Sequence, residues 1–262
     1  MSAVAWSEET VQVAGTPVHY YCGGEGPPLL VLHGLDPNPA WLACHQALAT
    51  HFRVYAPTHP GFGRTPLVPW MRRVSDLTLF YLWLLEEMGL ERVLLLGHGL
   101  GGWVAADLAI TCPHLVERLV LVDAAGVKPP HGEILDVFLL PWPEVQAALV
   151  ATPTPEWQRH FGATSTPEEE ERWETVLVAL ARLSWKPYLY DPRLPHVLPR
   201  LRCPTLIVWG REDRLLPLAC GELYRERIAA SRLVVLEACG HYPHVEQPQA
   251  FLEAVVPFLR PN

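Results

Sequence analysis

Short apolar segments recur along the chain, and helical patterns separate them. Each segment is rich in leucine and β-branched residues and is bounded by Gly, Pro or Asp. Segments that are apolar on both faces are typical of buried parallel strands, and the helices between them are then the crossover connections. The pattern predicts an α/β fold with a mostly parallel sheet, whose strands include residues 29–32, 53–56, 93–96, 118–122, 205–209 and 233–236.

An antiparallel hairpin is predicted ahead of these strands. Residues 11–13 and 18–21 are apolar, and the sequence Ala-Gly-Thr-Pro at 14–17 between them is typical of a turn. With this hairpin at one edge of the sheet, we expect eight strands. A crossover helix is predicted further on, with Ser75 as its N-cap and Gly89 as its stop.

The pattern changes between residues 126 and 199. Prolines and tryptophans become frequent there, and no convincing strand is found. The clearest helix starts at Thr166-Pro167-Glu168-Glu169, a capping box with proline at the first helical position. We therefore expect residues 1–125 and 200–262 to form one α/β core, and 126–199 to form an inserted helical cap. One face of the cap helix is predicted to be apolar: Trp173, Val176, Leu177, Leu180 and Ser184.

Composition excludes several classes of partner. The chain has 262 residues, a formal charge of −8 and no cluster of Lys and Arg, so we expect it to bind neither nucleic acid nor an anionic membrane. No apolar run approaches the ~20 residues of a membrane helix, and we expect no signal peptide in the N-terminal segment, which has Glu8 and Glu9 and no apolar core. The cysteines form no metal-site or disulfide pattern, which predicts a cytoplasmic protein with reduced thiols and no bound metal: Cys22, Cys44, Cys112, Cys203, Cys220 and Cys239.

A glycine-rich turn follows the segment 93–96 and opens the next helix. Residues 97–103 read Gly-His-Gly-Leu-Gly-Gly-Trp. In the pattern G-x-S-x-G, the middle residue sits in a strained strand-to-helix turn that projects its side chain above the sheet, and the flanking glycines let strand and helix approach each other. Gly97 and Gly101 match this pattern, but the middle residue is Gly99.

Five stretches together resemble the α/β-hydrolase superfamily over nearly the whole chain. The turn at 97–101 resembles the nucleophile turn, although glycine replaces its serine. In the stretch 56–64, Thr58 stands near the place where an aspartate is common, a departure that concerns a structural turn more than the chemistry. The five stretches are His33-Gly34-Leu35, APTHPGFGR at 56–64, GHGLG at 97–101, VWGREDRLLP at 208–217 and CGHYPHVEQP at 239–248.

The resemblance implies an eight-stranded α/β-hydrolase fold and a Ser-His-Asp type of site. Asp213 would be the acid and His241 the base, and the order nucleophile, acid, base along the chain is that of the family. The backbone N–H groups of Leu35 and Leu100 would stabilise an oxyanion. No cofactor is implied.

Other residues compete for these roles. Asp123, at the end of the preceding strand, is the alternative acid, and His244 is the alternative base. We interpret His33 and His98 as structural residues that line the pocket. Tryptophans of the cap are more often packing residues than substrate contacts, although they would also suit an apolar acyl pocket.

Gly99 removes the attacking atom of such a site. Without a hydroxyl no acyl-enzyme forms, and loss of the nucleophile in such triads costs on the order of a million-fold in rate. Glycine tolerates the strained turn and opens space for a substrate. Because the acid, the base and the oxyanion turn are all retained, we favour an engineered loss of the serine over a natural chain that never had one.

One rival interpretation is a dinucleotide-binding fingerprint. Gly97, Gly99 and Gly102 form an apparent G-x-G-x-x-G, and Asp123 follows at the end of the next strand. We disfavour it because this fingerprint belongs to the first strand–helix turn of a sheet, whereas strands precede it here. It would also leave the Asp213 and His241 turns unexplained.

The sequence therefore predicts the scaffold of a carboxylic ester hydrolase that acts on a small to medium apolar acyl ester and is inactivated at Gly99 in this chain. Alternatives on the same fold are a C–C bond hydrolase of the meta-cleavage-product type, a cofactor-free lyase or oxygenase with a His/Asp general base, and a non-catalytic binding protein. Haloalkane dehalogenases are disfavoured because they have an aspartate in the nucleophile turn. The expected partner is a small apolar ester or a related molecule, and a homodimer is left open.

Overall fold

The computed structural model describes residues 4–162 and 166–260. Its strands are β1 (Trp6–Val13), β2 (Thr16–Gly23), β3 (Pro28–Leu32), β4 (Arg53–Pro57), β5 (Val93–His98), β6 (Val116–Val122), β7 (Thr205–Gly210) and β8 (Ser231–Leu236). Its α-helices are α1 (Ala43–Leu48), α2 (Val74–Glu87), α3 (Leu100–Thr111), α4 (Trp142–Leu149), α5 (Pro155–Phe161), α6 (Pro167–Ser184), α7 (Leu194–Val197), α8 (Leu218–Arg227), α9 (Pro243–Glu246) and α10 (Pro248–Leu259). Two short 3-10 helices are η1 (Val137–Leu139) and η2 (Leu198–Arg200).

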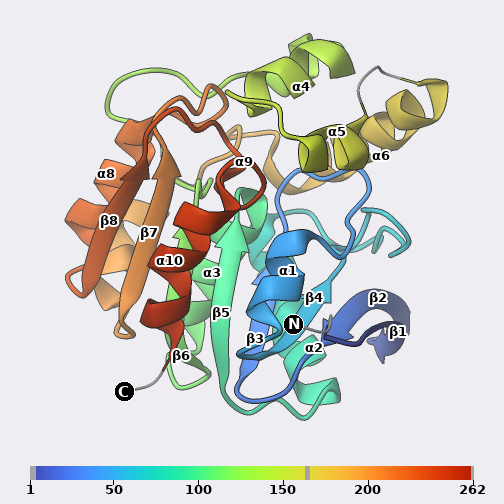
Figure 1. The fold of residues 1–262 in the computed structure, drawn as a ribbon, viewed down its shortest axis with the longest axis vertical. Helices are drawn as coiled ribbons and strands as arrows, with labels where there is room; N and C mark the ends of the chain where they lie inside the picture. The colour runs from blue at the N-terminus through green and yellow to red at the C-terminus, as the bar shows by residue number, and fades with distance from the viewer. Residues whose placement is uncertain (1–3, 163–165, 261–262) are drawn as a thin grey trace.

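All eight strands form one sheet in the order β1-β2-β4-β3-β5-β6-β7-β8 (Figure 1). β1 pairs antiparallel with β2, and β2 pairs antiparallel with β4. All pairings among the six strands β3 to β8 are parallel. The sequence prediction of an eight-stranded, mostly parallel α/β sheet is confirmed. The crossover order brings the carboxyl ends of β5, β6 and β7 next to one another, where ligands bind in open α/β sheets.

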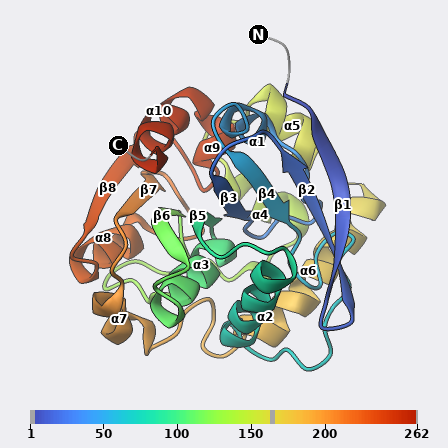
Figure 2. The ribbon, with the colours of Figure 1, turned by 90° about the horizontal axis from the view of Figure 1, so that it is seen from below.

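Helices cover both faces of the sheet, as Figure 2 shows. Side chains alternate along the strands, so that Val93 and Leu95 belong to the core under α2, α3 and α8, while Leu94 and Leu96 belong to the core under α1 and α10. Burial on both faces explains why the central strands read as continuous apolar runs.

The predicted hairpin is present and longer than its apolar residues indicated. β1 and β2 pair from Trp6 and Gly23 to Val13 and Thr16. The two residues between the strands, Ala14 and Gly15, have φ angles of 49° and 77°. Such angles are typical of the tight turn that matches strand twist. Most side chains of β1 are exposed, and the sequence of its first half is mostly polar. That half therefore has no apolar run from which a strand could be predicted.

The predicted start of α2 is wrong by two residues. Ser75 is not the N-cap, because the helix begins at Val74 after Arg73. The first-turn carboxylate of Asp76 accepts hydrogen bonds from the backbone N–H groups of Arg72 and Arg73, at 2.8 and 3.2 Å. An acidic side chain at the third helical position thus reaches back to the backbone just ahead of the helix, which is one half of a capping box. The other end is as predicted, since Gly89 follows the helix with φ +64°.

The segment between β6 and β7 contains the helices α4 to α7, and α4, α5 and α6 lie over the carboxyl ends of the strands (Figure 1). The predicted capping box of α6 is present: the Glu169 N–H donates to Thr166 Oγ1 at 3.3 Å, and the Thr166 N–H to Glu169 Oε2 at 2.9 Å. Of the predicted apolar face, Leu177 is partly buried and the rest are buried: Trp173, Val176, Leu180 and Ser184. The division into a core of 1–125 and 200–262 and a cap of 126–199 stays a prediction.

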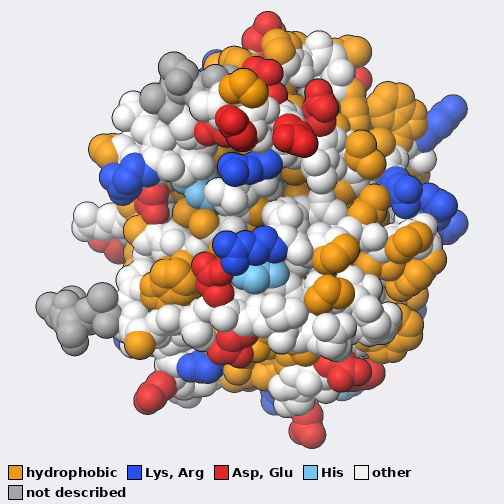
Figure 3. All heavy atoms as spheres, turned by 90° about the vertical axis from the view of Figure 1, so that its right-hand side faces the viewer, with side chains coloured by type: hydrophobic (Ala, Val, Ile, Leu, Met, Phe, Trp, Pro, Cys, Tyr) orange, Lys and Arg blue, Asp and Glu red, His pale blue; other side chains and the backbone are white. Residues whose placement is uncertain are grey.

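The surface shows no large field of one charge on the face drawn in Figure 3, where basic side chains alternate with acidic ones. In the part of the chain that the structure describes, no helix is long and apolar enough to cross a membrane. All six cysteines are unpaired, and five of them are buried.

Candidate active site

Gly99 lies at the sharp turn between β5 and α3, with φ 53° and ψ −118°. L-residues rarely adopt this conformation, and it is characteristic of strained functional turns. The neighbouring glycines are required by close packing. A Cβ atom at Gly97 would collide with the carbonyl oxygen of Gly101, and one at Gly101 with the carbonyl oxygen of Leu32. The turn therefore has the backbone of a nucleophile elbow, with glycine at its apex.

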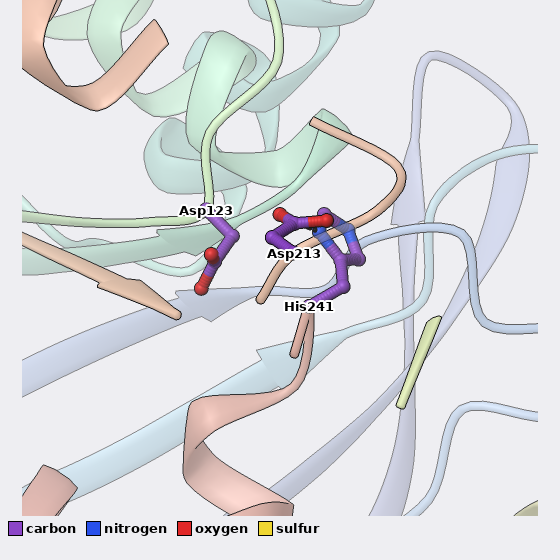
Figure 4. A group of neighbouring side chains, drawn as sticks. All are labelled: Asp123, Asp213 and His241. Carbon is purple, nitrogen blue, oxygen red and sulfur yellow. Dashed lines mark hydrogen bonds and ion pairs between the residues drawn. The ribbon is translucent and has the colours of Figure 1, made fainter. Parts of the chain in front are cut away.

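Asp213 and His241 lie side by side at the carboxyl ends of β7 and β8, as Figure 4 shows. The His241 Nδ1–H donates to Asp213 Oδ2 at 2.7 Å, and neither side chain is exposed. The other carboxylate oxygen, Oδ1, accepts from the N–H groups of Leu215 and Leu216 at 2.8 and 3.0 Å. The carboxylate is thus fixed from both sides, and it orients the imidazole.

The second ring nitrogen of His241 faces Gly99. A Cβ atom built on Gly99 lies 3.2 Å from His241 Nε2 and 3.3 Å from the Cα atom of Gly34. His241 Nε2 is buried, and among the described residues it has no hydrogen-bond partner. A side chain at position 99 would start from this Cβ, and a hydroxyl on it would lie within reach of Nε2.

Two backbone donors complete the surroundings of Gly99. Leu35 follows the His33-Gly34 turn, and Leu100 is the first residue of α3. Within the described ranges, the N–H groups of these two buried residues donate no hydrogen bond. The Gly101 N–H donates to the His33 carbonyl at 3.0 Å and so holds the two turns together. Two free donors beside a nucleophile position are what an oxyanion hole requires.

The alternative acid, Asp123, is near the pair but does not bond the histidine. Figure 4 shows its side chain at the end of β6, beside Asp213. Its Oδ1 accepts from the Gly210 N–H at 2.9 Å, and its Oδ2 has no partner among the described residues. Burial, and then the charge of Asp213, raise the pKa of Asp123 well above its usual range. The neutral acid is therefore favoured there, while Asp213 is the carboxyl group that contacts the imidazole.

The alternative base is also set apart. His244 lies beside His98, with ring centroids 4.8 Å apart, and the described structure gives it no bond to either aspartate. Burial lowers the pKa of His244 to about 3. The geometry brings together Asp213, His241 and Gly99, and leaves His244 outside this group.

His33 and His98 hold the backbone of the site. His33 Nδ1 lies 2.8 Å from the Gly34 carbonyl, and its Nε2 accepts from the His59 N–H at 2.9 Å. His98 Nε2 donates to the His241 carbonyl oxygen at 2.7 Å. Burial lowers the pKa of His33 to about 4 and that of His98 well below its usual range. The neutral form of both rings is thus favoured, and their ring nitrogens contact backbone groups.

Glu246 is an important residue that sequence reasoning missed. Its buried carboxylate accepts the Gly240 N–H with both oxygens at 3.0 Å, and the Tyr242 N–H at 3.2 Å. It also accepts from the N–H groups of Ala151 and Thr152, at 2.9 and 3.1 Å. It therefore fixes the backbone on both sides of His241 and ties it to the segment after α4. Its place in the stretch 239–248 was visible, but the backbone donors around it were not.

Asp123, Asp213 and His241 also offer ligand atoms within 4.8 Å of one another. His241 Nδ1 and Asp213 Oδ2 are already joined by a 2.7 Å hydrogen bond, and Asp213 Oδ1 already accepts from two backbone N–H groups. The residues therefore fit an acid–base pair better than a metal site. The dinucleotide interpretation fits poorly as well, because the glycine turn follows β5, and Asp123 is bonded to the Gly210 backbone.

A sequence model described as the alpha/beta hydrolase family matches residues 29–254. The chain belongs to this family. Among alpha/beta hydrolases, it is 32% identical to the pimeloyl-[acyl-carrier protein] methyl ester esterase of Aeromonas salmonicida, over 90% of this chain and 96% of the relative. It is 29% identical to the 2-hydroxy-6-oxo-2,4-heptadienoate hydrolase of Pseudomonas putida, over 95% of each chain.

The solved structures agree on the fold. The 2-hydroxy-6-oxo-6-phenylhexa-2,4-dienoate hydrolase of Rhodococcus sp. strain RHA1 superposes with a TM-score of 0.80 at 23% identity, covering 98% of this chain and 100% of that one. The predicted superfamily and fold class are confirmed. The chain is a hydrolase-type alpha/beta scaffold related to esterases and to meta-cleavage-product hydrolases.

Proposed function

We propose that this chain has the scaffold of a carboxylic ester hydrolase of the Ser-His-Asp type, with Gly99 at the position of the nucleophile. The observation that carries the proposal is the buried His241 Nε2, which has no partner among the described residues and lies 3.2 Å from the Cβ position of residue 99. The Asp213 bond on the other ring nitrogen supports the same assignment.

With serine at position 99, the residues present would support an acyl-enzyme route. His241 Nε2 would take the hydroxyl proton as the oxygen attacks the ester carbonyl, and Asp213 would stabilise the resulting imidazolium. The N–H groups of Leu35 and Leu100 would hold the negative oxygen of the tetrahedral intermediate. His241 would then protonate the departing alcohol, and water would release the acid by the same steps.

Glycine leaves every part of this route in place except the attacking oxygen. The chain as it stands forms no acyl-enzyme, and the loss is on the order of a million-fold in rate. Retention of the acid, the base and the two free amide donors supports an engineered change at residue 99 in preference to long-standing loss of function.

The relatives suggest the substrate class. We propose an ester as the substrate, because the relative that is 32% identical is a methyl ester esterase. We propose an apolar acyl group of small to medium size, held under the helices α4 to α6 acting as a lid. Buried aromatic side chains of these helices support an apolar lining: Trp142, Trp157, Phe161 and Trp173. The six unpaired cysteines favour a reducing compartment such as the cytoplasm.

A C–C bond hydrolase is the second candidate, because the hydrolase of Pseudomonas putida is 29% identical over nearly the whole chain. It would act on a meta-cleavage product, a class distinct from esters. A lyase or oxygenase that uses His241 as a general base needs no serine, and turnover of such a substrate by the Gly99 chain would identify it.

The test compares the chain with Gly99→Ser on p-nitrophenyl esters of increasing acyl length. We expect a burst of p-nitrophenol equal to the enzyme concentration from the serine variant only. The rates along the series then show which acyl length the pocket accommodates. If the serine variant is folded and shows neither burst nor turnover, the ester hydrolase proposal fails. A meta-cleavage product is then the next substrate to assay.

A further inference from the structure

We infer that the chain as it stands hydrolyses activated esters by itself, with His241 activating a water molecule that occupies the place of the missing hydroxyl. The inference rests on the proposed ester hydrolase site and goes beyond it. It assigns this chain a direct, single-displacement activity that needs no side chain at position 99.

The first support is the polar environment in front of Gly99. His241 Nε2 is buried and has no partner within the described residues. Outside residues 98–100, the atoms nearest to the Cβ position of Gly99 are this nitrogen at 3.2 Å and the Gly34 Cα at 3.3 Å. The N–H groups of Leu35 and Leu100 donate to no described residue. Buried polar groups in proteins are nearly always satisfied by protein or by ordered water, so this place suits a water molecule or a substrate oxygen.

The second support is the tautomer of the histidine. Asp213 Oδ2 accepts from Nδ1–H at 2.7 Å, so the neutral ring carries its lone pair on Nε2, the nitrogen that faces Gly99. Both Asp213 oxygens are fixed, one by the ring and the other by two backbone N–H groups. The base is therefore oriented before a substrate arrives, which is the requirement for general-base catalysis.

The reaction balances with water alone. The water oxygen bonds to the ester carbonyl carbon, its proton passes to His241 Nε2, and the carbonyl π electrons move to the oxygen near Leu35 and Leu100. The intermediate then collapses, the bond to the alcohol oxygen breaks, and that oxygen takes the proton from Nε2. The products are the acid and the alcohol, and no bond to the protein forms.

The test uses p-nitrophenyl acetate with the full chain, Gly99→Ala, Gly99→Ser and His241→Ala, each checked for folding by its melting temperature. We expect the Gly99 chain to exceed buffer with a linear time course, and His241→Ala to lose on the order of 100-fold of that excess. Gly99→Ala should lose at least about tenfold, because its methyl carbon would stand 3.2 Å from Nε2, where the water is held. Intact mass should show no acyl adduct on the Gly99 chain.

Gly99→Ala and Gly99→Ser are matched, because both add a Cβ to the same positive-φ backbone. A burst from the serine variant therefore shows that the strain itself is tolerated. If the Gly99 chain is no faster than His241→Ala, or if Gly99→Ala keeps the rate of the Gly99 chain, the inference is overturned. The ester hydrolase proposal survives either result as long as Gly99→Ser gives its burst. If that burst is absent and the Gly99 chain still depends on His241 and Gly99, the direct route stands and the acyl-enzyme route fails.

Discussion

His241 Nδ1 lies 2.7 Å from Asp213 Oδ2, and both side chains are fully shielded from solvent. This contact joins the turn after β7 to the turn after β8, two segments 28 residues apart in the chain. Because the carboxylate is also held by the Leu215 and Leu216 backbone, it is a fixed partner that sets both the orientation and the tautomer of the ring.

Replacement of each aspartate in a Gly99→Ser background separates their roles. We expect Asp213→Asn to lower kcat by roughly 10³- to 10⁴-fold, because the amide no longer favours the Nδ1–H tautomer or the imidazolium. Asp123→Asn should change kcat less than about tenfold, because Asp123 is favoured in its neutral form and an amide oxygen still accepts from Gly210. The measurement is steady-state kinetics on one p-nitrophenyl ester. The reverse order of effects would make Asp123 the acid.

Loss of the Glu246 carboxylate should loosen the loop that holds the base. We expect Glu246→Ala to lower the free energy of unfolding by about 3 kcal/mol or more, since several backbone N–H groups lose a charged acceptor. The downfield NMR signal of the His241 Nδ1 proton should also shift or broaden, because the N–H groups of Gly240 and Tyr242 beside it are released. Urea unfolding measures the first effect, with exposed Glu253→Ala as the control, expected to change stability within ~0.5 kcal/mol. A stable variant with an unchanged proton signal would contradict this role.

Stability should fall as the solution becomes acidic. Burial lowers the pKa of six histidines, His51 among them, and in five of the six the shift is large. These five stay neutral in the folded state while the unfolded chain takes up protons below about pH 6.5. The free energy of unfolding therefore declines from about pH 6.5 towards 4, by up to ~1.4 kcal/mol per pH unit for each group. The five are His33 and His45 with pKa about 4, His244 with about 3, and His59 and His98 with values well below the usual range.

One buried histidine acts in the opposite direction. Burial disfavours the charge of His160, but the nearby Asp36 carboxylate, 2.7 Å away, outweighs burial and raises its pKa. This pair adds stability below about pH 6.5 that is lost as the pH rises through the raised pKa of His160. Urea unfolding at pH 7.5 and 5.0 gives the net effect, and His45→Gln should make the decline shallower. Equal stabilities at the two pH values would show that the histidines do not titrate in this way.

The sheet could be predicted from the sequence because its central strands are buried on both faces. Continuous apolar runs such as 93–96 are then unambiguous, whereas the exposed residues of β1 carry no such signal. The start of α2 was missed because Asp76 caps the helix from inside its first turn. Ser75 as an N-cap and Asp76 as a first-turn acceptor are both compatible with the sequence, and the sequence alone does not decide between them.

The residues of the candidate site were also visible in the sequence, but not their contacts. Asp213 and His241 each lie in a short continuous motif, so the spacing of residues within each motif identifies them. The choice between Asp213 and Asp123 depends on which carboxylate reaches Nδ1, and this is a property of strand order and turn geometry. Glu246 and the His33–His59 contact depend on backbone donors brought together by the fold. The spacing of residues in the sequence does not predict which backbone N–H groups will face these side chains.

The most direct test of the site is the mass of Gly99→Ser after brief mixing with an activated ester and acid quenching. We predict one acyl group per chain, located by peptide mapping on the serine introduced at position 99, and its loss in the double variant with His241→Ala. The Gly99 chain should remain unmodified under the same conditions. A folded Gly99→Ser protein that takes up no acyl group, or takes it up at another residue, would contradict the assignment of Gly99 as the nucleophile position.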